Sequence, residues 1–269
     1  MMKTTANDIR ERLESWRVQS PTEDGYFEVI SPKKSDCAAV HIYRLNLPAG
    51  KKHTIFSDNL EMNGVVIAGK AVVKTDKLDS KLEKFDSFYV CADTTVDIVS
   101  EEDLIIYIAG AEGTKSGYQR VTKFDITLPI GDIHQIHGKG VGEREVMFTC
   151  EPQLPAERLI CGLTWSRPGT WTSWPPHQHE KDLEEVYCYF DMDDPKMGLH
   201  ISYLHSGDRQ DMVVHPVQSG TMVLAPRGYH PTVAMPGTTN AYFWALAAFN
   251  NESRRYDLAV LDPQLENEN

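Results

Sequence analysis

The stretch PHQHEKDLEEVY at residues 176–187 places two histidines two positions apart and a glutamate within six residues of the second. Side chains at i and i+2 of an extended strand point to the same face, so His177 and His179 are expected to aim their imidazoles into one space. A carboxylate from the next strand would add a third ligand. Two nitrogens and an oxygen suit a divalent cation such as zinc, manganese, iron or nickel.

A second stretch, GTMVLAPRGYH at residues 220–230, supplies a further histidine. It reads as a strand, a tight corner and the start of another strand. Pro226 fixes φ and Gly228 permits a positive φ, so the corner is well defined and places His230 reproducibly. His230 alone would be an ordinary loop histidine. Together with His177 and His179, it indicates a fourth ligand.

Most of the remaining chain has a hydrophobic period of two. The short segments are rich in β-branched and aromatic residues and are broken by Gly, Pro, Asp and Asn, which favours an all-β sandwich or barrel. Residues 5–16 are the exception, because Ile9, Leu13 and Trp16 have helical spacing and Thr5 with Asp8 resembles a capping box. The expected strands are 38–47, 65–73, 88–91, 103–108, 146–150, 159–165, 186–190, 200–204, 212–217, 222–224 and 242–247.

The strand pattern occurs twice, which predicts two similar barrel modules at residues 1–125 and 126–269. Each half has the size of a small barrel, and 110–142 would carry the crossover. No flexible Gly/Ser linker separates them, so close packing is expected. The first module lacks the ligand set. His53 stands alone there, and Val96 or Asp97 occupies the corner where a histidine would be needed.

Composition limits the partners and the compartment. The 269 residues carry a formal net charge of −12, which argues against nucleic acid or an anionic membrane surface but permits an anionic substrate at a local cationic site. No apolar run approaches the ~18 residues of a membrane span, and no signal peptide is evident. The five cysteines are scattered and odd in number, which predicts free thiols in a cytoplasmic protein.

These motifs resemble the cupin superfamily, and more closely the family that joins 5-keto-4-deoxyuronate isomerase and 5-deoxy-glucuronate isomerase. The resemblance rests on 175–179 with 183–187, and on 228–231 with 236–237. It implies a bicupin, with two double-stranded β-helix (jelly-roll) barrels in one chain and a short N-terminal helix. It also implies a ketol-isomerase that converts 5-deoxy-glucuronate to 2-deoxy-5-keto-gluconate in myo-inositol catabolism.

Which glutamate binds the metal is open between Glu184 and Glu185. Glu184 has the generic cupin spacing, whereas the Glu-Val-Tyr signature of the narrower family favours Glu185. Alternation would then place Glu185, Tyr187 and Tyr189 on the inner face and leave Glu184 outside. The preferred metal set is His177, His179, Glu185 and His230, with zinc as the first expectation and manganese, iron or nickel as alternatives.

The proposed isomerisation also needs a proton-transfer group and a cation for the substrate carboxylate. Tyr187 and Tyr229 are plausible pocket residues by their place in the motifs, although aromatic packing would explain them equally well. Arg144 and Arg227 are candidates for binding the carboxylate. His134 and His137 lie in the glycine-rich crossover, where a loop role is expected. The sequence does not identify the base.

Three other functions compete with this one. An isomerase of the pectin-pathway 5-keto-4-deoxyuronate is the nearest alternative. A metal-dependent cupin dioxygenase would need ferrous iron and consume oxygen, and a sugar-binding cupin would show no turnover. The expected partner is a small anionic sugar acid, and exposed barrel edges also favour a homo-oligomer.

Overall fold

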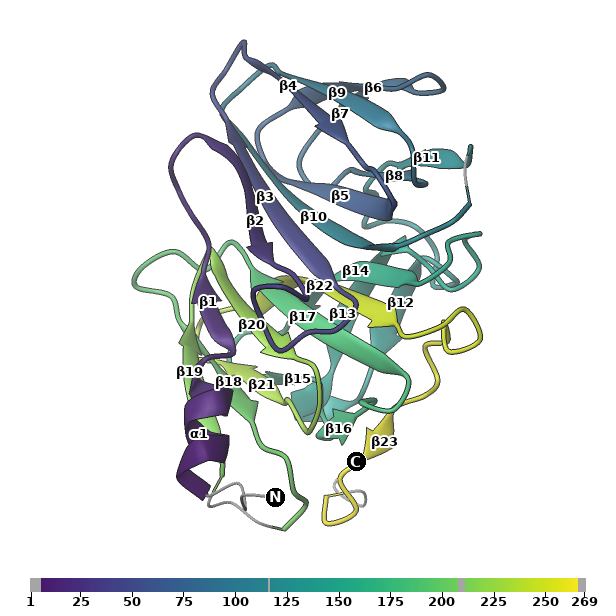
Figure 1. Cartoon of the computed structure of the whole chain (residues 1–269). Helices are drawn as coiled ribbons and strands as arrows, with labels where there is room; N and C mark the ends of the chain where they lie inside the picture. Colours follow the sequence, from purple (N-terminus) through teal and green to yellow (C-terminus); the bar gives the residue numbers. More distant parts are fainter. Residues whose placement is uncertain (1–5, 116, 208–210, 266–269) are drawn as a thin grey trace.

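The computed structural model describes residues 6–115, 117–207 and 211–265. It contains two β-barrels stacked on one another, with one short helix, α1 (Ala6–Glu14), beside the second barrel (Figure 1). The prediction of an all-β chain with a short N-terminal helix is confirmed. Thr5 of the expected capping box lies outside the described residues. Within the described ranges, no helix has the length and apolar character that crossing a membrane requires.

The first barrel consists of a six-stranded sheet facing a four-stranded sheet. The strands are antiparallel, and their inner faces enclose a cluster of buried aliphatic side chains that includes Leu45, Met62 and Ile106. In spatial order the larger sheet contains β11 (Gln119–Thr122), β8 (Ser87–Val90), β5 (Leu60–Ala68), β10 (Leu104–Glu112), β3 (His41–Leu47) and β2 (Gly25–Ile30), and the smaller contains β4 (Lys52–Phe56), β9 (Thr95–Ser100), β6 (Ala71–Lys74) and β7 (Asp79–Leu82).

The second barrel repeats this plan with a seven-stranded and a four-stranded sheet. A separate pair, β16 (His177–Gln178) and β23 (Val260–Leu261), lies at one end, and the 3-10 helix η1 (Gly140–Gly142) precedes β13. The larger sheet contains, in order, β1 (Arg17–Gln19), β20 (Thr221–Ala225), β17 (Leu183–Tyr189), β22 (Ala241–Ala248), β14 (Leu159–Ser166), β13 (Arg144–Cys150) and β12 (His134–His137), and the smaller contains β15 (Trp171–Thr172), β21 (Thr232–Ala234), β18 (Gly198–Ser202) and β19 (Val213–Val217).

The outer faces of the two larger sheets pack against each other. One apolar cluster joins Val65 and Tyr107 of the first barrel to Val186 and Phe243 of the second. Burying such a surface is the main favourable contribution to holding the barrels together. The large sheet of the second barrel therefore has the barrel interior on one side and the barrel–barrel interface on the other.

Two buried carboxylates cross this interface in opposite directions. Glu61 of β5 accepts hydrogen bonds from the backbone N–H groups of residues 157–159 at 2.7–2.8 Å. Glu184 of β17 accepts three from residues 38–40 at 2.6–2.7 Å. Residues 38–40 lead into β3, and residues 157–159 lead into β14, so each barrel binds the same turn of the other. Each carboxylate thus gains the partners that its burial requires.

Two strand predictions need correction. The segment 65–73 is not one strand, because β5 ends at Ala68 and β6 begins at Ala71, with Gly69 at φ +79° between them. A Cβ on Gly69 would meet the Asp103 carbonyl oxygen at 2.2 Å, so this corner needs glycine. The crossover 110–142 is likewise not only loop, since it contributes β11 and β12.

The N-terminal segment lies in the first half of the sequence but packs on the second barrel. β1 pairs with β20, with Arg17 opposite Val223 and Gln19 opposite Thr221. Leu13 and Trp16 of the preceding helical segment are buried in the shared apolar cluster. The edge of β20 is thereby covered by a strand that is distant in sequence, a common way of protecting a sheet edge.

Candidate metal centre

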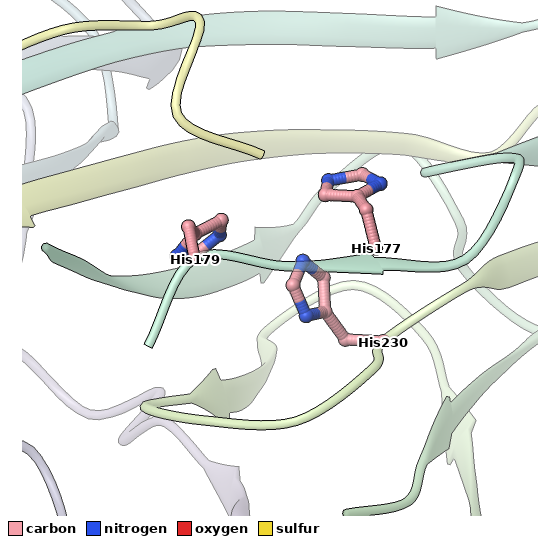
Figure 2. Close-up of side chains that lie close together, drawn as sticks. All are labelled: His177, His179 and His230. Atoms are coloured by element: carbon pink, nitrogen blue, oxygen red, sulfur yellow. The ribbon is translucent and has the colours of Figure 1, made fainter. Parts of the chain in front are cut away.

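Two chain segments bring three histidines together at one end of the second barrel. His177 lies in β16, where it is paired with Leu261, and His179 follows directly after that strand. His230 follows the corner between β20 and β21, where Gly228 has φ +70°. Figure 2 shows the three imidazoles turned toward a common space, and one ring nitrogen of each lies within 4.8 Å of the others.

Backbone carbonyls fix the tautomer of all three rings. The Nδ1 atoms lie 3.0 Å from the Pro175 oxygen for His177, 3.1 Å from the Leu183 oxygen for His179 and 3.0 Å from the Gly228 oxygen for His230. A carbonyl oxygen can only accept, so each Nδ1 must carry the hydrogen. The Nε2 atoms then present lone pairs, which is the arrangement that metal-binding histidines adopt.

Glu185 completes the cluster from β17. Its Oε2 lies 3.2 Å from His179 Nε2 and 3.3 Å from His230 Nε2. Burial opposes ionisation of this carboxyl, but the two neighbouring imidazoles outweigh that effect and lower its pKa. Burial also lowers the pKa of His177 to about 3, reinforced by His230 and His179. Glu185 is therefore ionised in a cluster where His177 is neutral.

This donor set fits a divalent cation. With every Nδ1 protonated, the Nε2 lone pairs and the Glu185 oxygens converge with no hydrogen between them, and such lone pairs repel unless a positive charge lies among them. Three imidazole nitrogens and one carboxylate oxygen are ligands that zinc and other first-row divalent ions accept. The residues present therefore suit a metal ion, and its identity is not fixed by them.

A cavity of about 250 Å³ opens beside the cluster. Its walls combine polar groups with aromatic rings, as small-molecule sites commonly do. Arg144 is the one permanently charged cation among the described residues that form these walls. The lining residues are His137, Arg144, Val146, Thr164, Ser173, Trp174, Pro175, His177, His179, Leu183, Glu185, Tyr187, Tyr242, Trp244, Leu246, Tyr256, Ala259 and Leu261.

Tyr187 and Arg144, both predicted for the site, lie in this cavity. The Tyr187 hydroxyl donates to Glu185 Oε2 at 3.0 Å and lies 2.6 Å from Ser173 Oγ. Arg144 Nη1 donates to the backbone oxygens of Gly142 and Trp174 at 3.1 and 3.0 Å. Among the described residues, Arg144 Nε and Nη2 have no hydrogen-bond partner, so that edge of the guanidinium can bind a ligand.

The structure does not bring Tyr229 or Arg227 to the cavity. The Tyr229 ring stacks on Tyr203 with centroids 5.0 Å apart, on the far side of the corner that places His230. Arg227 lies near Asp36 and Glu184. Burial opposes ionisation of Asp36, but hydrogen bonds from Arg12 and Trp16 and the charges of Arg12 and Arg227 lower its pKa. Alternation explains Tyr229, which is next to His230 and forms a bridge with Tyr203, whereas Arg227 lies in the bend before Gly228.

Glu184 is also directed away from the cluster, toward the first barrel. Its predicted position on the outer face of β17 agrees with the structure, but that face is buried and not solvated. Both of its carboxylate oxygens accept hydrogen bonds from backbone N–H groups of the first barrel, so Glu184 is not a ligand in the histidine cluster. Between the two glutamates, Glu185 is the one with contacts to the cluster, at 3.2 Å from His179 and 3.3 Å from His230.

Sequence reasoning missed several walls of the cavity. His137 lies in β12 and lines the cavity, whereas the sequence favoured a loop role. His134 does not line it, because its ring is held by the Leu128 oxygen at 2.6 Å and Glu145 at 2.8 Å. Tyr256 and Leu261 come from the C-terminal segment, which carries no motif. Residues 134–137 contain one apolar residue, the exposed Ile136, so no hydrophobic period marks this strand.

Comparisons with known proteins agree with this architecture. A sequence model of the KduI/IolB family matches residues 16–266. The 5-deoxy-glucuronate isomerase of Geobacillus kaustophilus (strain HTA426) is 26% identical over 246 residues, which cover 85% of this chain and 86% of that protein.

Two solved structures share the fold. An IolB-like protein from Salmonella typhimurium LT2 has a TM-score of 0.76 at 24% identity and covers 88% of this chain and 94% of its own. A mutant of Bacillus subtilis oxalate decarboxylase has a TM-score of 0.59 at 12% identity, with 91% and 77% covered. The predicted bicupin architecture is confirmed by these matches.

Proposed function

The chain belongs to the KduI/IolB family, and on that premise we propose that it is a metal-dependent ketol-isomerase that converts 5-deoxy-glucuronate to 2-deoxy-5-keto-gluconate. The observation that carries the proposal is the cluster of three bare Nε2 atoms with Glu185, from which His177, His179 and Glu185 line a cavity that also holds Arg144. The relative from Geobacillus kaustophilus is named for this reaction, which supports an enzyme of the isomerase class.

The reaction requires a proton to leave the carbon that bears the hydroxyl and to return at the neighbouring carbonyl carbon. The intermediate is an enediolate, with negative charge shared by two adjacent oxygens. A divalent cation bound by His177, His179, Glu185 and His230 would supply Lewis-acid stabilisation of that charge. The side chains hold the donor set rigidly, since each imidazole is fixed by a backbone carbonyl and Glu185 by the Tyr187 hydroxyl.

Arg144 is the residue that we assign to the carboxylate of the sugar acid. Its Nη1 is held by two backbone oxygens, so the guanidinium is already oriented before a ligand arrives. The Nε and Nη2 edge is the side that can form a bidentate pair with a carboxylate. The aromatic walls, Trp174, Tyr242 and Tyr256, exclude water around the sugar carbons.

The setting of the enzyme follows the same proposal. We assign it to the cytoplasm, because its five cysteines are all free and buried. We propose zinc as the metal, with manganese, iron or nickel as alternatives, and a small anionic sugar acid as the partner. The net charge of −12 disfavours nucleic acid and anionic membranes. A homo-oligomer is also proposed.

The test is to follow purified, metal-loaded protein by NMR with 5-deoxy-glucuronate in heavy water. We expect the ketone isomer to appear with deuterium at the former carbonyl carbon, and chelation to stop both. A parallel reaction with 5-keto-4-deoxyuronate examines the pectin-pathway substrate. Turnover of that compound alone would replace the proposed substrate. Oxygen consumption with ferrous iron would indicate a dioxygenase, and metal binding without turnover of either uronate would indicate a sugar-binding cupin.

A further inference from the structure

A fourth histidine lines the cavity without belonging to the metal cluster. His137 is the last residue of β12, and its partner across the sheet is Arg144. The first barrel has no equivalent of this strand, because its larger sheet ends at β2 where the second continues from β13 to β12. The added strand therefore places one imidazole next to the guanidinium that we assign to the substrate carboxylate.

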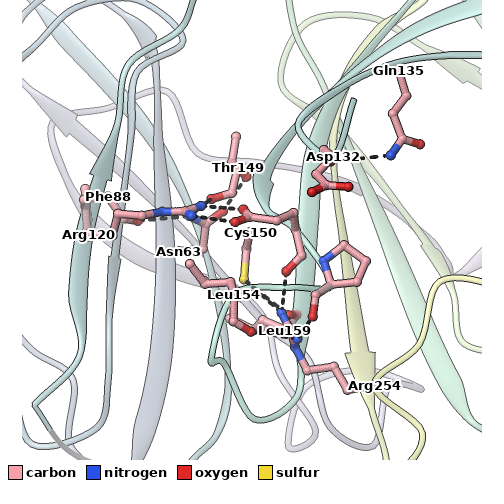
Figure 3. Close-up of polar contacts among 12 residues, drawn as sticks. Asn63, Phe88, Arg120, Asp132, Gln135, Thr149, Cys150, Leu154, Leu159 and Arg254 are labelled. Carbon is pink, nitrogen blue, oxygen red and sulfur yellow. Dashed lines mark hydrogen bonds and ion pairs between the residues drawn. The ribbon is translucent and has the colours of Figure 1, made fainter. Parts of the chain in front are cut away.

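A hydrogen-bond chain along β12 fixes the tautomer of His137. The Gln135 amide nitrogen donates to the Asp132 oxygen at 3.4 Å (Figure 3), so its Oε1 is the atom that faces His137. That oxygen lies 2.6 Å from His137 Nε2 and can only accept, which places the hydrogen on Nε2. Nδ1 then keeps its lone pair. It has no partner among the described residues and is not a buried atom.

The other proton-transfer groups on the cavity wall are already committed. The Tyr187 hydroxyl donates to Glu185. Burial raises the pKa of Tyr242 to about 12, and it also raises the pKa of Tyr256, so both phenols keep their protons. The remaining imidazoles direct their lone pairs at each other and at Glu185. Of the described lining residues outside the proposed metal ligands, His137 is thus the one with a free lone pair on a neutral nitrogen.

We propose that His137 is the catalytic base of the isomerisation, accepting the substrate C–H proton on Nδ1, exchanging it with solvent and delivering a proton to the neighbouring carbon. This inference rests on the proposed function. The C–H electron pair becomes the C=C bond of the enediolate, and the imidazolium delivers its proton to the former carbonyl carbon. The hydroxyl oxygen loses its proton and the former carbonyl oxygen gains one, so the atoms balance without a co-reactant.

The surroundings keep this base unprotonated before the reaction. Burial lowers the pKa of His137 to about 4, and the charge of Arg144 adds to that effect. Arg144 from β13 and the Tyr256 ring, with its centroid at 5.8 Å, are the titratable groups that face it. Gln135 stabilises the orientation of the ring without the negative charge that would hold a proton on it. Arg144 in turn would draw the acid group of the substrate beside it.

The tautomer can be measured without any substrate. In ¹⁵N-labelled protein, long-range ¹H–¹⁵N spectra at pH 7 should show His137 with a protonated Nε2 and a bare Nδ1, identified by its absence in His137→Gln. A doubly protonated ring, or a hydrogen on Nδ1, would overturn the assignment, since Nδ1 would then have no lone pair to accept the substrate proton.

Turnover provides the second measurement, with His134→Gln as the matched control on the same strand. We expect His137→Gln to keep its metal content and melting temperature and to lose kcat by about 10²- to 10⁴-fold, the usual contribution of a general base, with little change in KM and partial rescue by added imidazole. His134→Gln should retain turnover.

Equal kcat values for His137→Gln and His134→Gln, in the presence of wild-type turnover, would overturn the role of His137 alone. A wild-type protein that neither isomerises nor exchanges the C–H proton of either uronate would overturn the proposed function, and the base with it. Deuterium incorporation separates the proton-transfer step from binding, because a variant that binds but cannot abstract the proton incorporates none.

Discussion

Strands β5 and β17 occupy equivalent positions in the two barrels, and both begin with Leu-Glu. Residues 60–66 of β5 read LEMNGVV, and residues 183–189 of β17 read LEEVYCY. The glutamates Glu61 and Glu184 occupy the same position and bind the opposite barrel in the same way. The inner-face positions differ: Met62 in the first barrel corresponds to Glu185 in the second, and both are buried. The scaffold is thus shared, and the chemistry depends on which side chains face inward.

The corner after the next strand shows the same difference. Val90 is paired with Met62, and Ala225 with Glu185. Counting on from these pairs aligns Asp93, with φ +57°, with Gly228, with φ +70°. The residue equivalent to His230 is then Thr95, which corrects the expectation of Val96 or Asp97. Backbone geometry was preserved where it sets the corner, while the ligand was not.

The largest effect should follow from removing a ligand from the second barrel. His179→Ala or His230→Ala is expected to lose tight metal binding and to lower kcat/KM by on the order of 10³-fold, because metal stabilisation of the developing charge is worth several kcal/mol. His53→Ala in the first barrel should change neither. Metal analysis and turnover on the same preparations check this. Full metal content in both His179→Ala and His230→Ala would contradict the assignment of the metal site to the second barrel.

A second test introduces a carboxylate into the first barrel at Met62, the position equivalent to Glu185. Met62→Glu should destabilise the protein by roughly 3–5 kcal/mol, the cost of an uncompensated buried charge. Met62 is buried in the apolar cluster of the first barrel. Denaturant unfolding gives the free energy, and Met62→Leu serves as the control. An unchanged midpoint for the glutamate variant would mean that the first barrel also tolerates a polar interior.

Replacing either of the two carboxylates that cross the barrel–barrel interface should lower the stability by a similar amount. Glu61→Gln and Glu184→Gln are each expected to lower stability by roughly 2–3 kcal/mol, because an amide loses the charge and turns a donor toward backbone N–H groups. Glu184→Gln should leave metal binding intact, whereas Glu185→Gln should weaken it. Thermal unfolding with metal analysis distinguishes the two. Metal loss in Glu184→Gln but not in Glu185→Gln would exchange their roles.

Acidification should affect the second barrel first. Burial lowers the pKa of His215 to about 4, with Arg17 adding to it, as burial does for His177. A histidine whose pKa is lowered in the folded protein contributes fully to the free energy of unfolding when the pH is above its pKa in the unfolded chain, about 6.5. That contribution is lost as the pH falls toward the pKa in the folded protein. Metal-free protein should lose about 1–2 kcal/mol per such histidine between pH 6.5 and 5. His215→Gln should flatten the pH dependence of unfolding, while a slope unchanged by that substitution would contradict the assignment.

Much of the fold and the metal cluster could be predicted because they depend on local patterns. A period of two, the HxH spacing and the Pro-x-Gly corner each constrain a few neighbouring residues. The choice of Glu185 needed the family signature, since alternation alone permits either register. The features that could not be predicted from the sequence depend on contacts between residues far apart in the chain. Nothing in Arg17–Gln19 indicates pairing with residues 221–223, and Tyr256 reaches the cavity only through the path of the C-terminal segment.

The positions of Tyr229 and Arg227 outside the cavity lining have a related reason. Proximity in sequence to a ligand was used as evidence for the pocket, but adjacent residues of a strand point to opposite sides. His137 was undervalued because the glycines around it suggested a loop. Its strand exists because β13 offers a free edge, which is a property of the assembled sheet.

The pairing of β1 with β20 has a consequence for how the protein is made. Ribosomes deliver residues 17–19 about two hundred positions before their partners, so the functional barrel cannot complete its larger sheet until nearly the whole chain has emerged. A gene fragment starting at residue 126 would encode every candidate ligand but leave the edge of β20 bare and open to association. The two barrels are distinct in architecture, but the second needs the N-terminal strand β1 to complete its larger sheet.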